Sequence, residues 1–325
     1  MKGKNAVNPY LDAILGAASK SQAVKINIEK LDEYAQIWAQ EDLPIPDWRM
    51  PVYLEADDNA FIQFLGIGNA LNYCFSNPKT KQKYETEYLG KLWRGAFGMW
   101  AALKRAHDEG VPILDPNFLE RIDTEEVKHI FTGNPELPMF RARANSLRLA
   151  GQALLNNFGS YAELFRRCDY RAFNSGIGII DKLVRHDSGY SDTAFFKPTN
   201  TVLRFHKRAN LFVMMYHGRA LSSNGALPPI KDAEDLTPPA DYEVPKALRH
   251  LGILEYSLEL ANAVDSGIEI PAHSQWEQEI RSQTVAAMVS LCQKSGKSIT
   301  AIDFKVWLEG KSSLNPHHLT ATTAY

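Results

Sequence analysis

Apolar residues recur at three- and four-residue intervals along most of this chain, the spacing that places them on one face of a helix. In residues 26–40, for example, Ile28, Leu31 and Ala35 follow this spacing, with charged residues between them. The pattern predicts helices over residues 26–40, 59–75, 97–109, 124–131, 139–157, 160–167, 205–216, 242–250, 254–265, 274–294 and 299–308.

Two regions instead show the short alternating runs that are typical of β-strands. Residues 83–93 alternate around Leu89-Gly90, which predicts a small hairpin. Residues 193–196 and 201–205 predict two further strands, because a turn-forming Lys-Pro-Thr-Asn sequence separates them.

The remaining pattern indicates how the chain is organised. Residues 222–239 are rich in Pro, Asp and Ser and are expected to form a long surface loop, since helices resume directly after it. We therefore expect a mainly α protein with one large helical domain over residues 1–325 and one or two small β-hairpins. Residues 1–50 are expected to be a helical N-terminal extension packed on this domain.

The composition is that of a globular protein, with 45% hydrophobic and 23% charged residues among 325. The formal net charge of -2 gives no strong positive field, so we expect no nucleic-acid partner. Cys74, Cys168 and Cys292 are far apart and form no CxxC pair, which fits a reducing compartment. No segment has the apolar length of a signal peptide or membrane span. We expect a cytoplasmic protein with no membrane partner and, without a heptad pattern, a monomer.

Sequence motifs for common cofactors and metals are missing from this chain. It has no GxGxxG, GxxxxGK[ST], HExxH or GxSxG sequence. The adjacent His317 and His318 lack the carboxylate or thiolate neighbours that would complete a zinc site. We therefore expect neither a metal site nor a cofactor.

Several segments, in a fixed order, carry a resemblance to a known family. They are residues 71–75 (LNYCF), 98–113 (GMW through RAHDEGVPI), 205–210 (FHKRAN), 240–256 (beginning ADYEVP), 279–281 (EIR), 303–307 (DFKVW) and 316–325. In their order and spacing they resemble the queuosine salvage proteins, also called queuosine-nucleotide N-glycosylases. The similarity extends over most of the chain, although no single segment is specific.

The resemblance implies a fold similar to that of helical DNA glycosylases. It also implies hydrolysis of the N-glycosidic bond of queuosine 5′-monophosphate to queuine and ribose 5-phosphate, so the expected partner is this small-molecule nucleotide. The resemblance further implies that Lys207 and Asp241 occupy the positions of the family's catalytic Lys and Asp. Two alternatives stay open, a hydrolase of another modified 7-deazapurine nucleotide or nucleoside, and a non-catalytic protein that binds queuine or its nucleotide.

Asp241 suits the chemistry of glycosidic hydrolysis. The reaction passes through an oxocarbenium-like state, which an ionised carboxylate near the anomeric carbon stabilises. Asp241 follows Pro238-Pro239 and precedes a predicted helix, whose N-terminus favours a negative charge. The same position also suits a carboxylate that only caps the helix, a contribution of about 1 kcal/mol.

Lys207 falls in the first turn of its predicted helix, where Asn210, Leu211 and Met214 share its face. An inward lysine there can hold the phosphate, the sugar or the catalytic carboxylate. Alternatively, Lys207 and Arg208 are a solvated basic pair on the surface.

A pocket for the flat queuine ring should offer stacking aromatic rings and directed hydrogen bonds. The predicted helix over residues 59–75 supplies candidates, because Asn69, Asn72 and Phe75 are spaced by about one turn and Tyr73 adjoins them. The same residues also fit a core helix that is capped by an amide.

Three more residues are candidates for substrate contact. Tyr242 follows the expected catalytic aspartate directly and can line the pocket. Glu279 and Arg281 lie close together in the predicted helix over residues 274–294, either as substrate contacts or as a structural ion pair.

The chain departs from the family pattern at some proposed substrate contacts. Asn69 replaces an acidic residue that usually precedes Asn72 by one turn. Near the C-terminus, Leu319-Thr320-Ala321 replaces basic residues, which leaves His317 and His318 as candidate phosphate partners. These departures concern the identity of the substrate more than the reaction.

Overall fold

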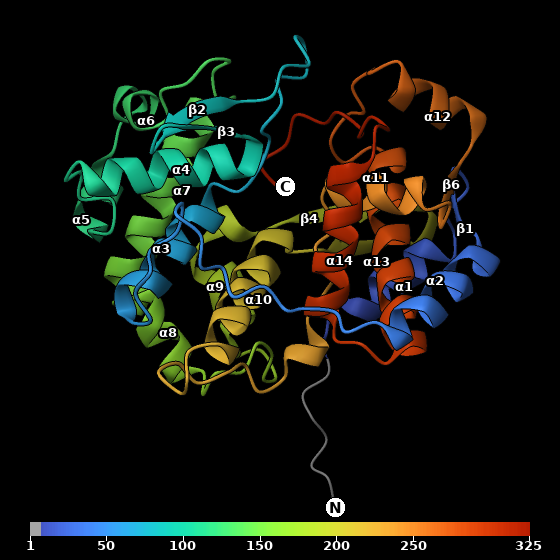
Figure 1. The fold of residues 1–325 in the computed structure, drawn as a ribbon, viewed down its shortest axis with the longest axis horizontal. Helices are drawn as coiled ribbons and strands as arrows, with labels where there is room; N and C mark the ends of the chain where they lie inside the picture. The colour runs from blue at the N-terminus through green and yellow to red at the C-terminus, as the bar shows by residue number, and fades with distance from the viewer. Residues whose placement is uncertain (1–7) are drawn as a thin grey trace, which may run out of the picture.

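The computed structural model describes residues 8–325, and this part of the chain is mostly helical (Figure 1). The prediction of a mainly α fold is confirmed. The α-helices are α1 (Leu11–Ala18), α2 (Ile28–Gln40), α3 (Asn59–Ala70), α4 (Gly95–Asp108), α5 (Pro116–Arg121), α6 (Thr124–Ile130), α7 (Phe140–Ala153), α8 (Tyr161–Arg167), α9 (Ile179–His186), α10 (Lys207–Leu221), α11 (Glu243–His250), α12 (Leu258–Asp265), α13 (Gln275–Ser295) and α14 (Ile299–Ser312).

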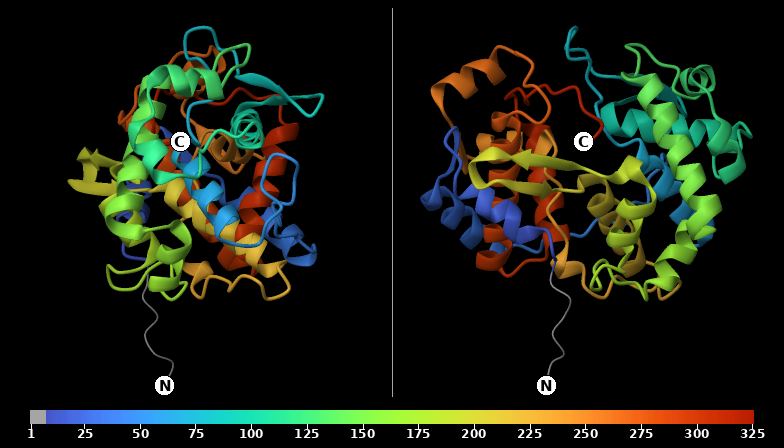
Figure 2. Two further views of the ribbon diagram at one scale, coloured as in Figure 1. Left: turned by 90° about the vertical axis from the view of Figure 1, so that its left-hand side faces the viewer. Right: turned by 180° about the vertical axis from the view of Figure 1, so that it is seen from behind.

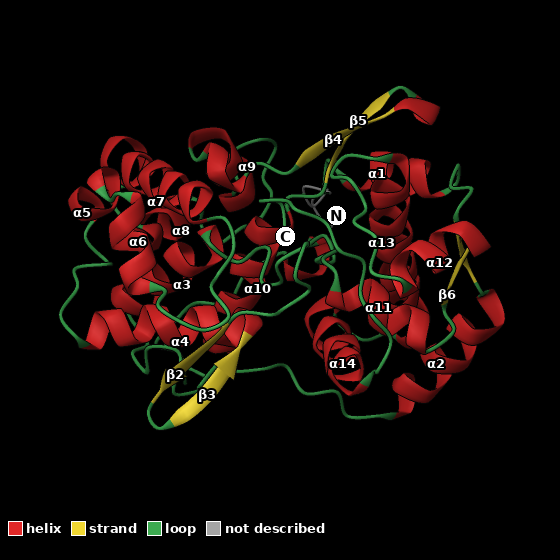
Figure 3. Cartoon of the chain, turned by 90° about the horizontal axis from the view of Figure 1, so that it is seen from above, coloured by secondary structure: helices red, strands yellow, loops and turns green. Residues whose placement is uncertain are grey.

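The helices form two groups with α10 between them (Figure 3). One group contains α3 to α8, in which α5 packs on α7 and α3 packs on α8. The other contains α1, α2 and α11 to α14, in which α13 contacts both α1 and α2 while α11 packs on α14. The chain ends between the two groups, so its last residues lie where the two groups meet (Figure 3).

Three small antiparallel sheets accompany the helices within residues 8–325. Both predicted hairpins are present, one as β2 (Glu85–Tyr88) with β3 (Lys91–Arg94) and the other as β4 (Thr193–Phe196) with β5 (Thr201–Arg204). The β4–β5 hairpin crosses behind the two groups of helices (Figure 2). It leads directly into α10 and thereby fixes where that helix begins.

The third sheet corrects one prediction. Residues 254–265 are not a single helix, because Leu254–Tyr256 form strand β6 and only the following residues form α12. β6 pairs with β1 (Val24–Ile26) from the N-terminal segment. A partner so distant in sequence leaves no local signal, and the apolar spacing of β6 alone also fits a helix.

The predicted helix over residues 59–75 is also shorter than expected, since α3 ends at Ala70. Two buried arginines bind the carbonyl groups that would otherwise continue it. Arg143 of α7 donates to three carbonyls within residues 71–75, and Arg208 of α10 donates to the carbonyl of Ala70. Residues 71–75 therefore form an irregular segment, and Asn72 and Phe75 do not lie on a helix.

Other element boundaries differ in smaller ways. The structure adds α1, α5 and α9, each of eight residues or fewer, too short for a clear helical period. The predicted helix over residues 139–157 is divided, because a π-helical turn over Leu154–Phe158 follows α7. The remaining helices agree with the predicted ranges to within a few residues, apart from α10 and α14, which extend further towards the C-terminus.

The segment over residues 222–239 is only partly the surface loop that was expected. Its last residues, from Leu236 onwards, are buried. The side-chain oxygen of Asn210 accepts the backbone N–H of Thr237 (2.9 Å), which ties this segment to α10. The buried end of the segment leads into Asp241, so the approach to that residue is rigidly held.

The N-terminal segment packs on the C-terminal helices. Leu31, Ala35 and Trp38 of α2 are buried, and α1 and α2 both contact α13. Glu279 of α13 accepts hydrogen bonds from the backbone N–H groups of Gln22 (3.0 Å) and Ala23 (2.6 Å). A buried carboxylate of the C-terminal half therefore holds the turn before β1 in place.

One hydrophobic cluster extends through both groups of helices. Trp100 belongs to it, and a Cβ at the buried Gly68 of α3 would lie only 1.9 Å from the Trp100 ring. Glycine thus allows Trp100 to pack directly on the helix backbone. Among the helices of residues 8–325, none is both long enough and apolar enough to cross a bilayer.

Candidate active site

A cavity lies between the two groups of helices, and α10 contributes one wall. Lys207, Leu211 and Met215 line it at intervals of four residues, which is one face of that helix. The other lining residues are Trp48, Tyr53, Asn72, Phe75, Lys83, Ala96, Phe97, Trp100, Pro239, Asp241, Tyr242, Glu243, Val244, Asp303, Phe304, Trp307, Lys311 and Tyr325.

Lys207 and Asp241, the two residues predicted to be catalytic, meet in this cavity. Their Nζ and Oδ2 atoms are 3.3 Å apart. The Lys207 side chain is almost fully buried, at 3% exposed, whereas Asp241 keeps 16% of its side chain exposed. Burial lowers the pKa of Lys207, and the neighbouring Asp241 opposes that shift. The solvated basic pair that was the alternative for Lys207 and Arg208 is wrong, since both are buried.

The face that Lys207 shares is not quite the predicted one. Leu211 lies beside it in the cavity as expected, but Met215 takes the place of Met214. Asn210 turns away, and its amide donates to the carbonyl of His206 (3.0 Å). Asn210 is thus a structural residue at the start of α10.

The two carboxylate oxygens of Asp241 have different surroundings. Oδ1 accepts the backbone N–H groups of Glu243 (2.8 Å) and Val244 (3.1 Å) at the start of α11. Oδ2 faces Lys207 in the cavity. The capping role and the catalytic role are therefore compatible, because one oxygen fixes the carboxylate and the other remains free for chemistry.

A buried ion pair behind the cavity joins the segments that carry these two residues. Arg281 of α13 donates to both carboxylate oxygens of Asp192 (2.9 and 2.5 Å) and, through Nε, to the carbonyl of Ala240 (3.1 Å). Asp192 in turn accepts the backbone N–H of Lys207 (3.2 Å). Arg281 thereby fixes the start of α10 and the residue before Asp241 relative to each other.

Asp303 is a second carboxyl group in the cavity, and it comes from α14. Its Oδ1 atom is buried without a hydrogen-bond partner. Burial and the nearby charge of Asp241 raise the pKa of Asp303 to about 8, although Lys207 opposes the shift. Asp303 is therefore protonated near neutral pH and can donate a hydrogen bond.

Aromatic side chains make up much of the cavity wall. Tyr53 and Trp100 lie with their ring centroids 5.0 Å apart, and Phe97 meets Trp307 edge to face at 5.6 Å. Such rings suit a flat heterocycle, which gains from stacking as well as from desolvation. The wall is thus suited to an aromatic base.

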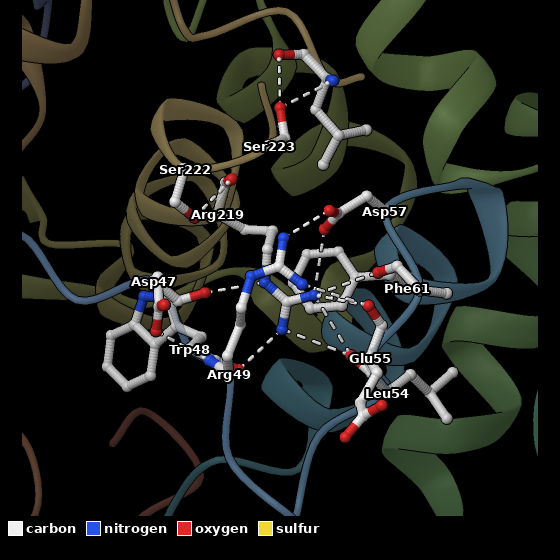
Figure 4. Close-up of polar contacts among 12 residues, drawn as sticks. Asp47, Trp48, Arg49, Leu54, Glu55, Asp57, Phe61, Arg219, Ser222 and Ser223 are labelled. Carbon is white, nitrogen blue, oxygen red and sulfur yellow. Dashed lines mark hydrogen bonds and ion pairs between the residues drawn. The ribbon is translucent and has the colours of Figure 1, made fainter. Parts of the chain in front are cut away.

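The segment that carries Trp48 and Tyr53 is held by Arg219 of α10 (Figure 4). The buried guanidinium donates to the carbonyls of Asp47 (2.7 Å), Trp48 (2.7 Å) and Ala56 (3.0 Å). It also pairs with Asp57 (3.1 Å). One side chain therefore sets the path of this wall of the cavity.

The structure divides the predicted substrate contacts into two sets. Asn72, Phe75 and Tyr242 line the cavity as expected. Asn69 and Tyr73 lie behind it. The side-chain oxygen of Asn69 accepts a hydrogen bond from the Asn72 amide (3.3 Å), and the Asn69 amide donates to the carbonyl of Leu65 (3.0 Å). The Tyr73 ring packs on the guanidinium of Arg143 at 4.4 Å.

Three further predicted contacts lie outside the cavity lining. Glu279 binds the backbone before β1, and Arg281 binds Asp192, so both side chains are occupied elsewhere. The Nε2 atom of His318 lies 3.1 Å from the hydroxyl of Tyr325, which does line the cavity. Arg281 and His318 thus support the cavity wall from behind, whereas Glu279 holds the N-terminal segment.

Comparison with known proteins identifies the family of this chain. The sequence model of the queuosine salvage protein family matches residues 52–322, most of the chain. The chain belongs to this family. The matched residues include both Lys207 and Asp241.

Individual relatives within the family cover between 77% and 94% of the chain. A queuosine 5′-phosphate N-glycosylase/hydrolase from Sphaerobacter thermophilus is 30% identical over 94% of each chain. Proteins of the same name from Dictyostelium discoideum and Bos taurus are 28% and 27% identical, the first over 94% of this chain and 95% of its own, the second over 77% and 76%.

Four charged residues that line the cavity of this queuosine salvage protein were not predicted, namely Lys83, Glu243, Asp303 and Lys311. Glu243 falls in the segment over residues 240–256 that resembles the family. Asp303 falls in the segment over residues 303–307 that resembles the family, so the resemblance contained a signal for it. Lys83 and Lys311 carry no such signal, because locally they look like solvated lysines beside a hairpin and at the end of a helix. Only the packing of α4, α11 and α14 brings them into the cavity.

Proposed function

We propose that this protein hydrolyses the N-glycosidic bond of queuosine 5′-monophosphate and releases queuine and ribose 5-phosphate. The observation that carries the proposal is the ion pair between buried Lys207 and Asp241 in an aromatic cavity. Family membership supports the choice of substrate, since the relatives described above are named for this reaction.

Asp241 stabilises the sugar as the bond breaks. The bonding electrons leave with the base, and positive charge develops at C1′ and the ring oxygen of the ribose. Oδ1 is held by the start of α11, so Oδ2 can face this charge and orient the attacking water. Water supplies the hydroxyl group that C1′ gains.

Asp303 assists departure of the base. A 7-deazaguanine lacks the basic N7 that could accept a proton, so the electron pair must be neutralised elsewhere on the ring. Asp303 is protonated near neutral pH and has an oxygen without a partner, which makes it the proton donor of this scheme. The proton released by water restores it.

Lys207 maintains the arrangement of charges. Its ammonium group lies 3.3 Å from Asp241 and favours the ionised carboxylate before the substrate binds. When positive charge develops on the sugar, Asp241 already has the geometry and charge that stabilise it.

The decisive experiment incubates the purified protein with queuosine 5′-monophosphate, queuosine and GMP, and follows the free base by mass spectrometry. We expect queuine from the monophosphate. Asp241→Asn should reduce this rate about 10²-fold or more, because it removes the charge that stabilises the transition state. Circular dichroism and the melting temperature of the variant check that its fold is retained.

Two outcomes would contradict the proposal. A variant with near wild-type turnover would remove Asp241 from the mechanism. Wild-type protein that binds queuosine 5′-monophosphate tightly without releasing queuine would be a binding protein, and release from another modified nucleotide alone would change the substrate.

We also propose that the protein works in the cytoplasm as a monomer. Cys74, Cys168 and Cys292 are all free thiols, as expected in a reducing compartment. Size-exclusion chromatography with light scattering tests the monomer directly.

A further inference from the structure

Lysine side chains gather around one carboxylate at the edge of the cavity. Lys83 Nζ lies 3.0 Å from Glu243 Oε1, and Lys246 pairs with Oε2 of the same residue at 2.5 Å. Lys311 Nζ is 3.9 Å from Oε1. Lys83, Lys311 and Glu243 all line the cavity, whereas Lys246 does not.

The cluster carries more positive than negative charge. Glu243 is ionised, because the three lysines lower its pKa to about 2 against the effect of burial. One carboxylate is shared by three lysines, so the cluster has an excess of positive charge, although burial lowers the pKa of Lys311. Lys83 and Lys311 keep 30% and 37% of their side chains exposed, so an incoming anion can reach them.

The first turn of α4 adjoins this cluster. No side chain caps the helix, which starts at Gly95, and Ala96 and Phe97 of the same turn line the cavity. Lys83 lies across this turn, since a Cβ at Gly95 would be only 2.3 Å from Lys83 Cε. A helix N-terminus and a lysine directed at one space favour an anion there.

The cations expected from the sequence to bind phosphate are occupied elsewhere. Lys207 pairs with Asp241. His318 is buried against Tyr325, and the Nδ1 atom of His317 lies 2.7 Å from the carbonyl of His318. The residues free to meet an anion in the cavity are therefore the lysines around Glu243.

We propose that Lys83, Lys311 and the first turn of α4 form the subsite for the 5′-phosphate of the substrate, with Glu243 as the carboxylate that holds the two lysines in place. This inference rests on the proposed function for the identity of the phosphate ester. Glu243 follows Asp241 by two residues, and both line the same cavity as Lys83 and Lys311, so a nucleotide whose phosphate is bound by the lysines can present its sugar to the catalytic carboxylate.

The test measures a phosphate-dependent and a phosphate-free property of the same variants. In Lys83→Met and Lys311→Met, kcat/KM for queuosine 5′-monophosphate should fall about tenfold or more, and ribose 5-phosphate should bind correspondingly more weakly, because each change removes a charged hydrogen bond. The Kd of queuine, which has no phosphate, should change by less than about twofold. Lys246→Met is the matched control, since Lys246 also pairs with Glu243 but lies outside the cavity lining.

Each result has one interpretation. An unchanged kcat/KM and an unchanged affinity for ribose 5-phosphate in the double variant Lys83→Met/Lys311→Met would overturn the subsite. An equal effect of Lys246→Met would also overturn it, because the loss would then follow from the reduced positive charge near Glu243 and not from a lysine that contacts the phosphate. If wild-type protein releases no queuine, the proposed function fails, whereas ribose 5-phosphate binding still tests the subsite.

Discussion

Two aspartates share the cavity but differ in their surroundings. Asp241 accepts two backbone N–H groups and faces Lys207, an environment that favours negative charge. Asp303 has a buried oxygen without a partner and a raised pKa of about 8. When their environments keep one carboxyl group ionised and a neighbouring one protonated, the first can stabilise positive charge and the second can donate a proton.

The raised pKa of Asp303 predicts how this residue affects stability. In the unfolded chain the carboxyl ionises near pH 4. Between about pH 4 and about pH 8 the native state keeps a proton that the unfolded state has lost, so the contribution of Asp303 to stability declines as pH rises through this window. The melting temperature of Asp303→Asn relative to wild type should therefore increase from pH 5 to pH 8.

The same variant should lose activity at neutral pH, because an amide cannot supply the proton that the base needs. Wild-type activity should decline above about pH 8, where Asp303 ionises. The residual activity of Asp303→Asn should show no such decline. Asp12→Asn serves as a control, since Asp12 is exposed and remote from the cavity. A difference in melting temperature between Asp303→Asn and wild type that stays constant from pH 5 to pH 8 would contradict this interpretation.

At the scale of elements, single buried arginines fix segments that have no regular structure. Arg143 and Arg208 bind the carbonyls of residues 70–74, Arg281 joins Asp192 to the segment before Asp241, and Arg219 binds the segment over residues 47–57. A guanidinium group suits this role because its five N–H groups can serve several carbonyls at once.

Arg219→Met tests this role on the cavity wall (Figure 4). The variant leaves the carbonyls of residues 47–56 without their donor, so we expect the free energy of unfolding to fall by about 3 kcal/mol or more. Hydrogen exchange should increase over residues 47–57, and KM should rise because Trp48 and Tyr53 line the cavity.

Arg49→Met is the matched control for this experiment. Arg49 also pairs with Asp57 but is more exposed, so its loss should cost no more than about 1 kcal/mol. Equal destabilisation by the two variants, or unchanged exchange in Arg219→Met, would show that Arg219 does not hold this wall.

At the scale of the whole molecule, the N-terminal segment closes one side of the fold. β1 pairs with β6, and α1 and α2 pack on α13. Glu279 binds the turn between α1 and β1. The predicted N-terminal extension therefore shares a sheet and a buried polar contact with the C-terminal half.

Removal of residues 1–27 should consequently destabilise the whole protein. The deletion exposes the edge of β6 and leaves the buried carboxylate of Glu279 without the N–H groups that it accepts. We expect the melting temperature to fall by about 10 °C or more, or the cooperative transition to be lost. Removal of residues 1–7 alone is the control, and equal stability of the two shortened proteins would refute the prediction.

The sequence by itself determined most helices, both hairpins and the family. Helical and strand periodicity are local properties, so they can be read from neighbouring residues. The family resemblance pointed to Lys207 and Asp241, and the structure places each at the start of a helix and both in one cavity.

Only the tertiary structure decided the end of α3, the strand β6 and the division of the predicted contacts between cavity and support. It also decided that Asp303, Lys83 and Lys311 face the same space as Asp241. Each of these depends on a partner far away in sequence, such as Arg143 for residues 71–75 or β1 for β6. A local pattern carries no information about such partners, because burial and charge pairing arise only when distant elements pack together.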